Sequence, residues 1–108
     1  MKDRCPTEIG GARVVGYAIV HPNHFHTQNT TQIVNGLVKP KATAMIIAQY
    51  QNEDCYYVFG CYTDQWITET DTWHETLEDA IEQLDWEYTD LSKSMVWYSQ
   101  PPNYDNPK

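Results

Sequence analysis

Three histidines stand close together in the first third of the chain. They are His21, His24 and His26, and the alternation of a strand would place His24 and His26 on one face. Three imidazoles can hold a zinc or copper ion and leave a fourth position open. The neighbouring Pro22 and Asn23 are instead typical of a polar loop, which is the simpler interpretation. No other motif implies a bound group, so we expect no cofactor.

A second set of residues could do nucleophilic chemistry. Asp71 and His74 lie three positions apart, and a Cys61 thiol near them in space would complete a Cys/His/Asp hydrolase. The same letters are typical of a turn before a helix, where His74 would be solvated. The chain has no nucleophile elbow, phosphate loop or dinucleotide fingerprint. We therefore expect no enzymatic activity, with a hydrolase using Cys61 or His74 as the weaker alternative.

Residues 76–89 form the one long helix that the sequence predicts. Thr76 and Asp79 make a capping box at its start. Its apolar positions recur at helical spacing and predict a buried stripe: Leu77, Ala80, Ile81, Leu84, Tyr88 and Leu91. Trp86 falls opposite this stripe. Acidic residues near the C-terminal end, at Glu82, Asp85 and Glu87, oppose the helix dipole, so stability alone does not account for them.

The outer side of this helix is a candidate docking surface for a basic protein. Carboxylates would steer the encounter, and exposed aromatic side chains would anchor it. The predicted partner-binding residues are Trp73, Glu75, Glu78, Asp79, Glu82 and Trp86. The alternative is a solvated acidic surface, with Trp86 covered by a loop or by the tail.

The remaining patterns predict an α+β fold. Alternating and apolar runs indicate strands at 12–20, 43–50, 55–62, 66–70 and 95–99, and Asn35-Gly36 indicates a tight hairpin. We expect a mostly antiparallel sheet of four to six strands, with the helix packed on one face and a strand after it. Residues 1–100 would form a single domain, followed by a flexible, proline-rich tail at 101–108.

Several predicted strands are apolar on both faces, and one helix can cover only one of them. The second face could be covered by loops, a second sheet layer, a second copy of the chain or a partner, and we favour a homodimer or a partner surface over loops alone. Alternatively, aromatic side chains on these strands could line a pocket for a small molecule. The candidate pocket residues are Tyr17, Tyr57, Phe59 and Trp66.

Charge and cysteine content limit the partners and the location. The net charge is −8, and residues 42–92 contain twelve carboxylates and no Lys or Arg, so we expect no nucleic-acid binding. No stretch reaches the ~20 apolar residues that span a bilayer, so we expect no membrane insertion. Cys55 and Cys61 would lie ~20 Å apart along one strand and could not form a disulfide. With no secretory signal at the N-terminus, we expect a cytoplasmic protein with reduced thiols.

Part of the chain, about residues 43–98, resembles a group of small acidic bacterial proteins. The resemblance is carried by Tyr56–Cys61, Trp66, Thr70–Ala80 and Trp86–Tyr88: a strand ending in Cys, a Trp, a Thr-Asp turn and an acidic helix. Such proteins occur on mobile elements, including integron cassettes, and in toxin–immunity neighbourhoods. The resemblance implies an interaction role but carries no catalytic signature. We therefore expect an interaction module, in its sharpest form an immunity-type or nuclease-inhibiting binder.

Overall fold

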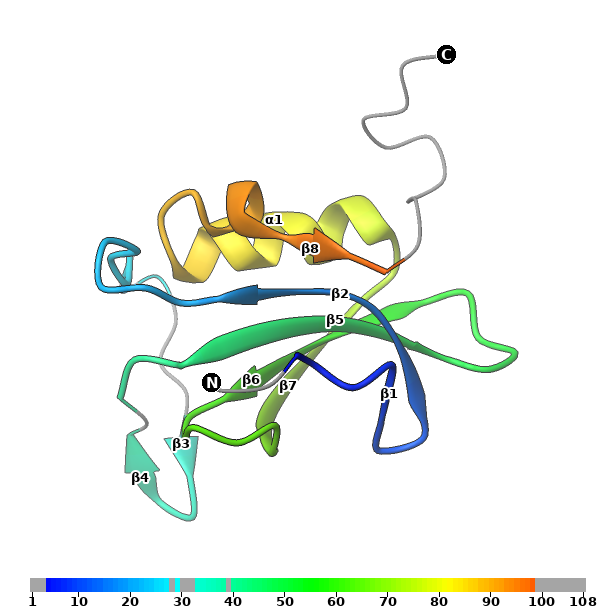
Figure 1. Cartoon of the computed structure of the whole chain (residues 1–108), viewed down its shortest axis with the longest axis horizontal. Coiled ribbons are helices and arrows are strands. Elements are labelled where there is room, and N and C mark those ends of the chain that lie inside the picture. Colours follow the sequence, from blue (N-terminus) through cyan, green and yellow to red (C-terminus); the bar gives the residue numbers. More distant parts are fainter. Residues whose placement is uncertain (1–3, 28, 30–32, 39, 99–108) are drawn as a thin grey trace.

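The computed structural model describes residues 4–27, 29, 33–38 and 40–98. Its main sheet is antiparallel in the order β1-β2-β5-β6-β7, and β8 also pairs with β2. The single α-helix of the described residues, α1, lies across one side of this sheet (Figure 1). The bounds are β1 Glu8–Ile9, β2 Ala12–Ile19, β3 Ile33–Val34, β4 Leu37–Val38, β5 Ala44–Tyr50, β6 Tyr56–Cys61, β7 Thr68–His74, α1 Leu77–Glu87, the 3₁₀ turn η1 Leu91–Ser94 and β8 Val96–Trp97. The α+β class and the strand after the helix are as predicted.

The helix α1 is held by its cap and by its apolar stripe. Thr76 Oγ1 accepts a hydrogen bond of 3.1 Å from the backbone N–H of Asp79, which satisfies one of the unpaired donors at the helix start. The predicted stripe is buried against the sheet, and together with Val15, Met45, Ile47 and Val58 it forms the core on the helix side. Leu91, which was predicted on the same stripe, is fully buried but belongs to η1.

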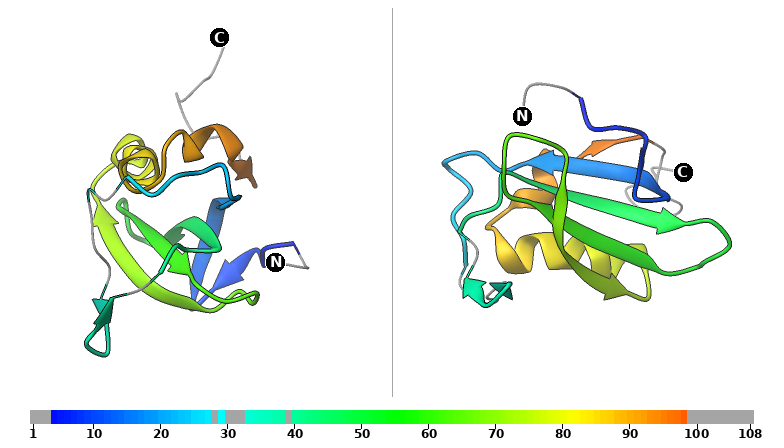
Figure 2. Two further views of the ribbon diagram at one scale, coloured as in Figure 1. Left: turned by 90° about the vertical axis from the view of Figure 1, so that its left-hand side faces the viewer. Right: turned by 90° about the horizontal axis from the view of Figure 1, so that it is seen from below.

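The structure corrects the preference for another molecule as the cover of the second face of the sheet. The sheet is strongly curled (Figure 2), and a second core fills its other side. Its buried members are Cys5, Ala12, Val14, Ala44, Ile46, Ala48, Phe59 and Cys61. The segment before β1 covers part of it, since Tyr98 donates a hydrogen bond to the Cys5 carbonyl and the Val14 N–H donates to the Thr7 carbonyl. The apolar second face is therefore no reason to expect a homodimer.

A bulge in β2 lets one strand supply both cores. Val14 pairs with Ala48 and Gly16 with Ile47, so Val15 is an extra residue in the ladder. Val14 packs in the second core, whereas Val15 packs in the core under α1. Gly16 is required here because a Cβ would lie 2.8 Å from the Trp97 ring and 3.0 Å from the Val96 carbonyl oxygen.

The strand β7 is longer than predicted and begins later. The residues after Thr70 were expected to form a turn before the helix, but Asp71 to His74 continue the strand and pair with β6. Thr70, Thr72 and Trp73 favour an extended backbone, and pairing with β6 outweighs the local turn preference of Asp71. This change of element decides where Trp73 and His74 point.

The hairpin β3-β4 stands apart from the main sheet (Figures 1 and 2). Asn35 and Gly36 both have positive φ, at 55° and 80°, as the predicted tight turn requires. All three cysteines are free, so the expectation that Cys55 and Cys61 do not pair is confirmed. The predicted tail at 101–108 lies outside the described residues. No helix in the described part of the chain is long and apolar enough to cross a membrane.

Candidate functional site

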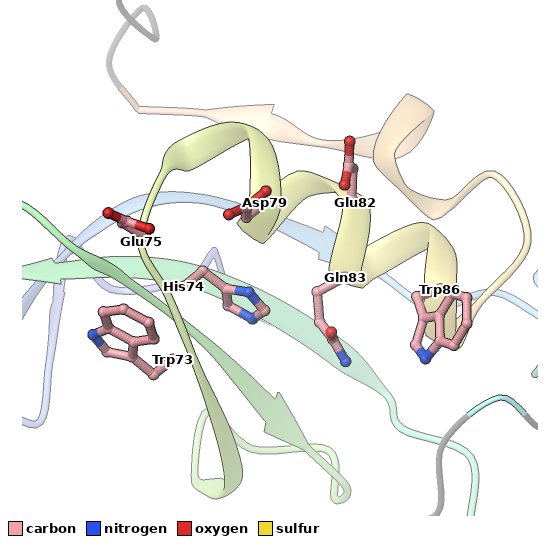
Figure 3. Close-up of a pocket in the computed structure, with 7 residues that line it drawn as sticks. All are labelled: Trp73, His74, Glu75, Asp79, Glu82, Gln83 and Trp86. Atoms are coloured by element: carbon pink, nitrogen blue, oxygen red, sulfur yellow. The ribbon is translucent and has the colours of Figure 1, made fainter.

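A groove of about 350 Å³ lies between α1 and the end of β7 (Figure 3). We call it the α1–β7 groove. Its walls are the last residues of β7 and the outer side of the helix: Trp73, His74, Glu75, Asp79, Glu82, Gln83 and Trp86. Both tryptophans remain about half exposed, at 58% for Trp73 and 53% for Trp86. Two large apolar rings therefore border a hollow that is open at the surface.

Helical and strand periodicity explain the composition of the groove. Burial of the α1 stripe turns Asp79, Glu82 and Trp86 away from the core, as the helical spacing predicted. On β7, His74 and Trp73 point to opposite sides of the strand, because successive side chains alternate. In Figure 3 the His74 and Gln83 side chains occupy the space between β7 and α1, with Trp73 on the other side of the strand.

The electrostatic character of the groove is negative. Glu75, Asp79 and Glu82 are exposed, and the lining contains no Lys or Arg. Another carboxylate lies beneath, since Glu87 is only 1% exposed and accepts a 2.8 Å hydrogen bond from the Gln83 amide. This hydrogen bond orients the Gln83 amide at the groove wall.

Two acids near the end of α1 have structural roles that the sequence did not reveal. The Asp85 carboxylate accepts hydrogen bonds from both the backbone N–H and the hydroxyl of Ser92, at 2.8 and 2.6 Å, and so ties η1 to the helix. Glu87 is part of the packed interior. The expectation that stability does not account for these acids is therefore wrong for Asp85 and Glu87, whereas Glu82 stays exposed in the groove.

The imidazole of His74 is an uncharged polar group on the groove wall. Its Nε2 lies 2.7 Å from the Thr72 hydroxyl. Burial lowers the pKa of His74, while the nearby carboxylates of Asp79 and Glu87 act in the opposite direction. At neutral pH this ring is neutral and adds no positive charge to the groove.

The groove brings together five of the six residues predicted to bind a partner: Trp73, Glu75, Asp79, Glu82 and Trp86. The sixth, Glu78, is exposed on the first turn of α1 but does not line the groove. The sequence analysis missed Gln83, and it considered His74 only for a hydrolase. The i,i+4 spacing of Gln83 and Glu87 was the signal that could have identified Gln83.

The structure does not assemble the histidine cluster into a metal site. His24 is buried, its Nδ1 accepts a hydrogen bond from the His21 backbone N–H, and its Nε2 lies 3.1 Å from the Ser94 hydroxyl. His26 instead packs its ring on Tyr88, with the centroids 5.1 Å apart. Among the described residues, no three or more His, Cys, Asp or Glu side chains form a group that could hold a metal ion. Both nitrogens of His24 are engaged, so the loop interpretation fits this segment.

The four candidate pocket aromatics belong to the second core. Tyr17 and Trp66 meet edge to face at 5.3 Å between centroids, and Tyr57 stacks on Phe59 at 6.1 Å. They pack against one another and against the strands. A separate hollow of about 590 Å³ lies near the β1-β2 turn and the end of β5, and none of these four lines it. Its walls carry both signs of charge, Arg13 with Glu8 and Glu53, so it lacks the single sign of the groove.

Cys61 and His74 do not come together. Cys61 pairs with Thr68 at one end of the β6-β7 ladder, and His74 pairs with Tyr56 at the other. Six residue-to-residue steps along the strand lead from Thr68 to His74, a distance of ~20 Å. Cys61 is also fully buried, and burial raises the pKa of its thiol to about 11. The arrangement that the hydrolase alternative needs is absent from these residues.

Comparison with protein-family models, with curated proteins and with solved structures found no match to this chain.

Proposed function

We propose that the protein is a non-enzymatic interaction module that binds a basic protein partner through the α1–β7 groove. One observation carries the proposal: two half-exposed indoles, Trp73 and Trp86, border a lining that has three carboxylates and no Lys or Arg. A surface that only keeps the protein solvated does not require two exposed indoles. Their combination with carboxylates is typical of a docking site.

The indoles supply the affinity in this proposal. An aromatic side chain can bury 150–250 Å², so half-exposed tryptophans retain roughly 100 Å² each for a partner to cover. At about 25 cal/mol per Å², covering one indole would contribute about 2.5 kcal/mol. That is the size of a hot-spot residue in a protein interface.

The carboxylates supply rate and selectivity. Their potential would accelerate the approach of a basic surface and repel an acidic one. Because Glu75, Asp79 and Glu82 are exposed, this contribution would weaken as salt is added. At high ionic strength the association rate would therefore fall more than the residence time of the complex.

The sharpest form of the proposal is an immunity-type inhibitor of a nuclease. A nuclease needs a basic surface to hold phosphates, and an acidic module with aromatic anchors complements such a surface. Carriage on a mobile element and action in the cytoplasm, where its three free cysteines stay reduced, fit this role.

The test is capture of a partner by the immobilised protein and by a double variant, Trp86→Ala with Glu82→Lys. We expect the wild-type protein to capture a basic protein at low salt, and the double variant to lose it. The matched control is Ile67→Ala with Asp64→Lys, which removes one exposed apolar side chain and reverses one charge outside the groove. Equal capture by the double variant and the wild type would refute the proposal.

A further inference from the structure

The strand β7 is a long edge of the main sheet. Among the described residues only β6 pairs with it, whereas the strand at the other end of the sheet, β1, has two residues. In an antiparallel ladder alternate residues turn their N–H and C=O groups outward. Residues 70–74, next to the groove, therefore present backbone donors and acceptors that a further strand could pair with.

The groove continues this edge. The helix α1 follows β7 after a short connection, and its Gln83 and Trp86 face the groove beside His74 at the end of β7 (Figure 3). A strand laid along β7 would alternate its side chains between two environments. Every second side chain of the added strand would lie on the helix side, next to Gln83 and Trp86. The side chains between them would lie on the side of Trp73.

Charge distinguishes a basic occupant from a second copy of the chain. β7 itself carries Glu69 and Asp71, Glu75 follows it, and the facing wall of α1 adds Asp79 and Glu82. Two copies paired edge to edge would set these carboxylates against one another, an arrangement that opposes self-association at a sheet edge. A segment rich in Lys or Arg would meet opposite charge on both sides.

We propose that the partner enters the α1–β7 groove as an extended basic segment that pairs with β7 as an additional strand. Main-chain hydrogen bonds to residues 70–74 supply register. Basic side chains on the side of Trp73 meet Glu69 and Asp71, and apolar side chains on the helix side cover Trp86. This inference rests on the proposed function and specifies how the same groove recognises its partner.

The probe is a capped peptide of seven alternating Arg and Val residues, matched to the length of β7. We expect it to bind, to shift the amide resonances of β7 and α1 in NMR spectra, and to slow hydrogen exchange at alternate amides within residues 70–74. A peptide N-methylated at its three central residues keeps its side chains and charge but loses main-chain donors on both edges. We expect it to bind at least about tenfold more weakly. The same peptide with Glu in place of Arg should not bind.

The outcomes separate this inference from the proposed function. If the parent and N-methylated peptides bind equally and both are weakened by Glu82→Lys, the groove is the site and strand pairing is overturned. If the Arg peptide fails to bind, or if the Glu peptide binds equally well, the inference that the partner enters as a basic extended segment is overturned. The capture experiment with the double variant still decides the proposed function in that case. Protection of the same amides in a peptide-free dimer would assign the edge to a second copy and would also overturn the inference.

Discussion

Replacing Tyr88 with Phe tests how the C-terminal end of α1 is fastened. The Tyr88 hydroxyl accepts a 2.7 Å hydrogen bond from the backbone N–H of Ala42, and both residues are almost completely buried. Phe keeps the ring in place but leaves that N–H without its partner. An unsatisfied buried donor destabilises a protein by about 1–3 kcal/mol. For a domain of this size the melting temperature falls by about 4–8 °C per kcal/mol, so we expect a loss of roughly 4–24 °C.

The assay is urea unfolding followed by tryptophan fluorescence, with a thermal scan as a second measure. Tyr50→Phe is the matched control, because Tyr50 is only partly buried and contacts Tyr57 through its ring. We expect this control to change the free energy of unfolding by less than about 0.5 kcal/mol. A Tyr88→Phe variant as stable as the control would refute the reasoning that this hydrogen bond joins α1 to the start of β5.

Three further predictions concern the two cores and the histidine loop. Gly16→Ala should lower the free energy of unfolding by about 1–3 kcal/mol in urea, because the new Cβ would overlap the Trp97 ring. Burial, together with His21 and Lys41, lowers the pKa of His24 below its ordinary value of 6.5. The stability that its neutral ring contributes is therefore complete above about pH 6.5 and declines as the pH falls below that value. In urea unfolding from about pH 8 to about pH 5, the free energy of unfolding should decline less in His24→Gln than in the wild type. With iodoacetamide at neutral pH, mass spectrometry should find Cys61 modified far more slowly than the half-buried Cys55, since the raised pKa of Cys61 leaves almost no thiolate.

Local signals in the sequence predicted the helix and the central strands well. The stripe from Leu77 to Leu84 and the cap at Thr76 define α1 to within a few residues. The Asn35-Gly36 pair predicted its hairpin because only residues that accept positive φ suit that turn. The exposure of Trp86 also followed from helical spacing alone.

Features that depend on contacts distant in the sequence were not predictable in the same way. The extent of β7 is decided by pairing with β6, against the turn preference of Asp71. The curl of the sheet and the segment around Cys5 bury the second face, and no periodicity in the strands reveals that covering. The roles of Asp85 and Glu87 likewise require Ser92 and Gln83 to be placed in space. The sequence predicted the wall of the groove that α1 forms. It predicted a turn where the end of β7 forms the other wall.

The bulge at Val15 makes the register of β2 insensitive to a change of chain length at one position. Deleting Val15 would restore regular alternation, with Val14 and Tyr17 still directed into the second core and Ala18 still under α1. Deleting a residue elsewhere in the strand, such as Ala18, would instead turn every following side chain to the opposite side. A change of length at the bulge therefore costs the buried Val15 side chain but keeps the register of β2, whereas a change two or three residues further along loses the register as well.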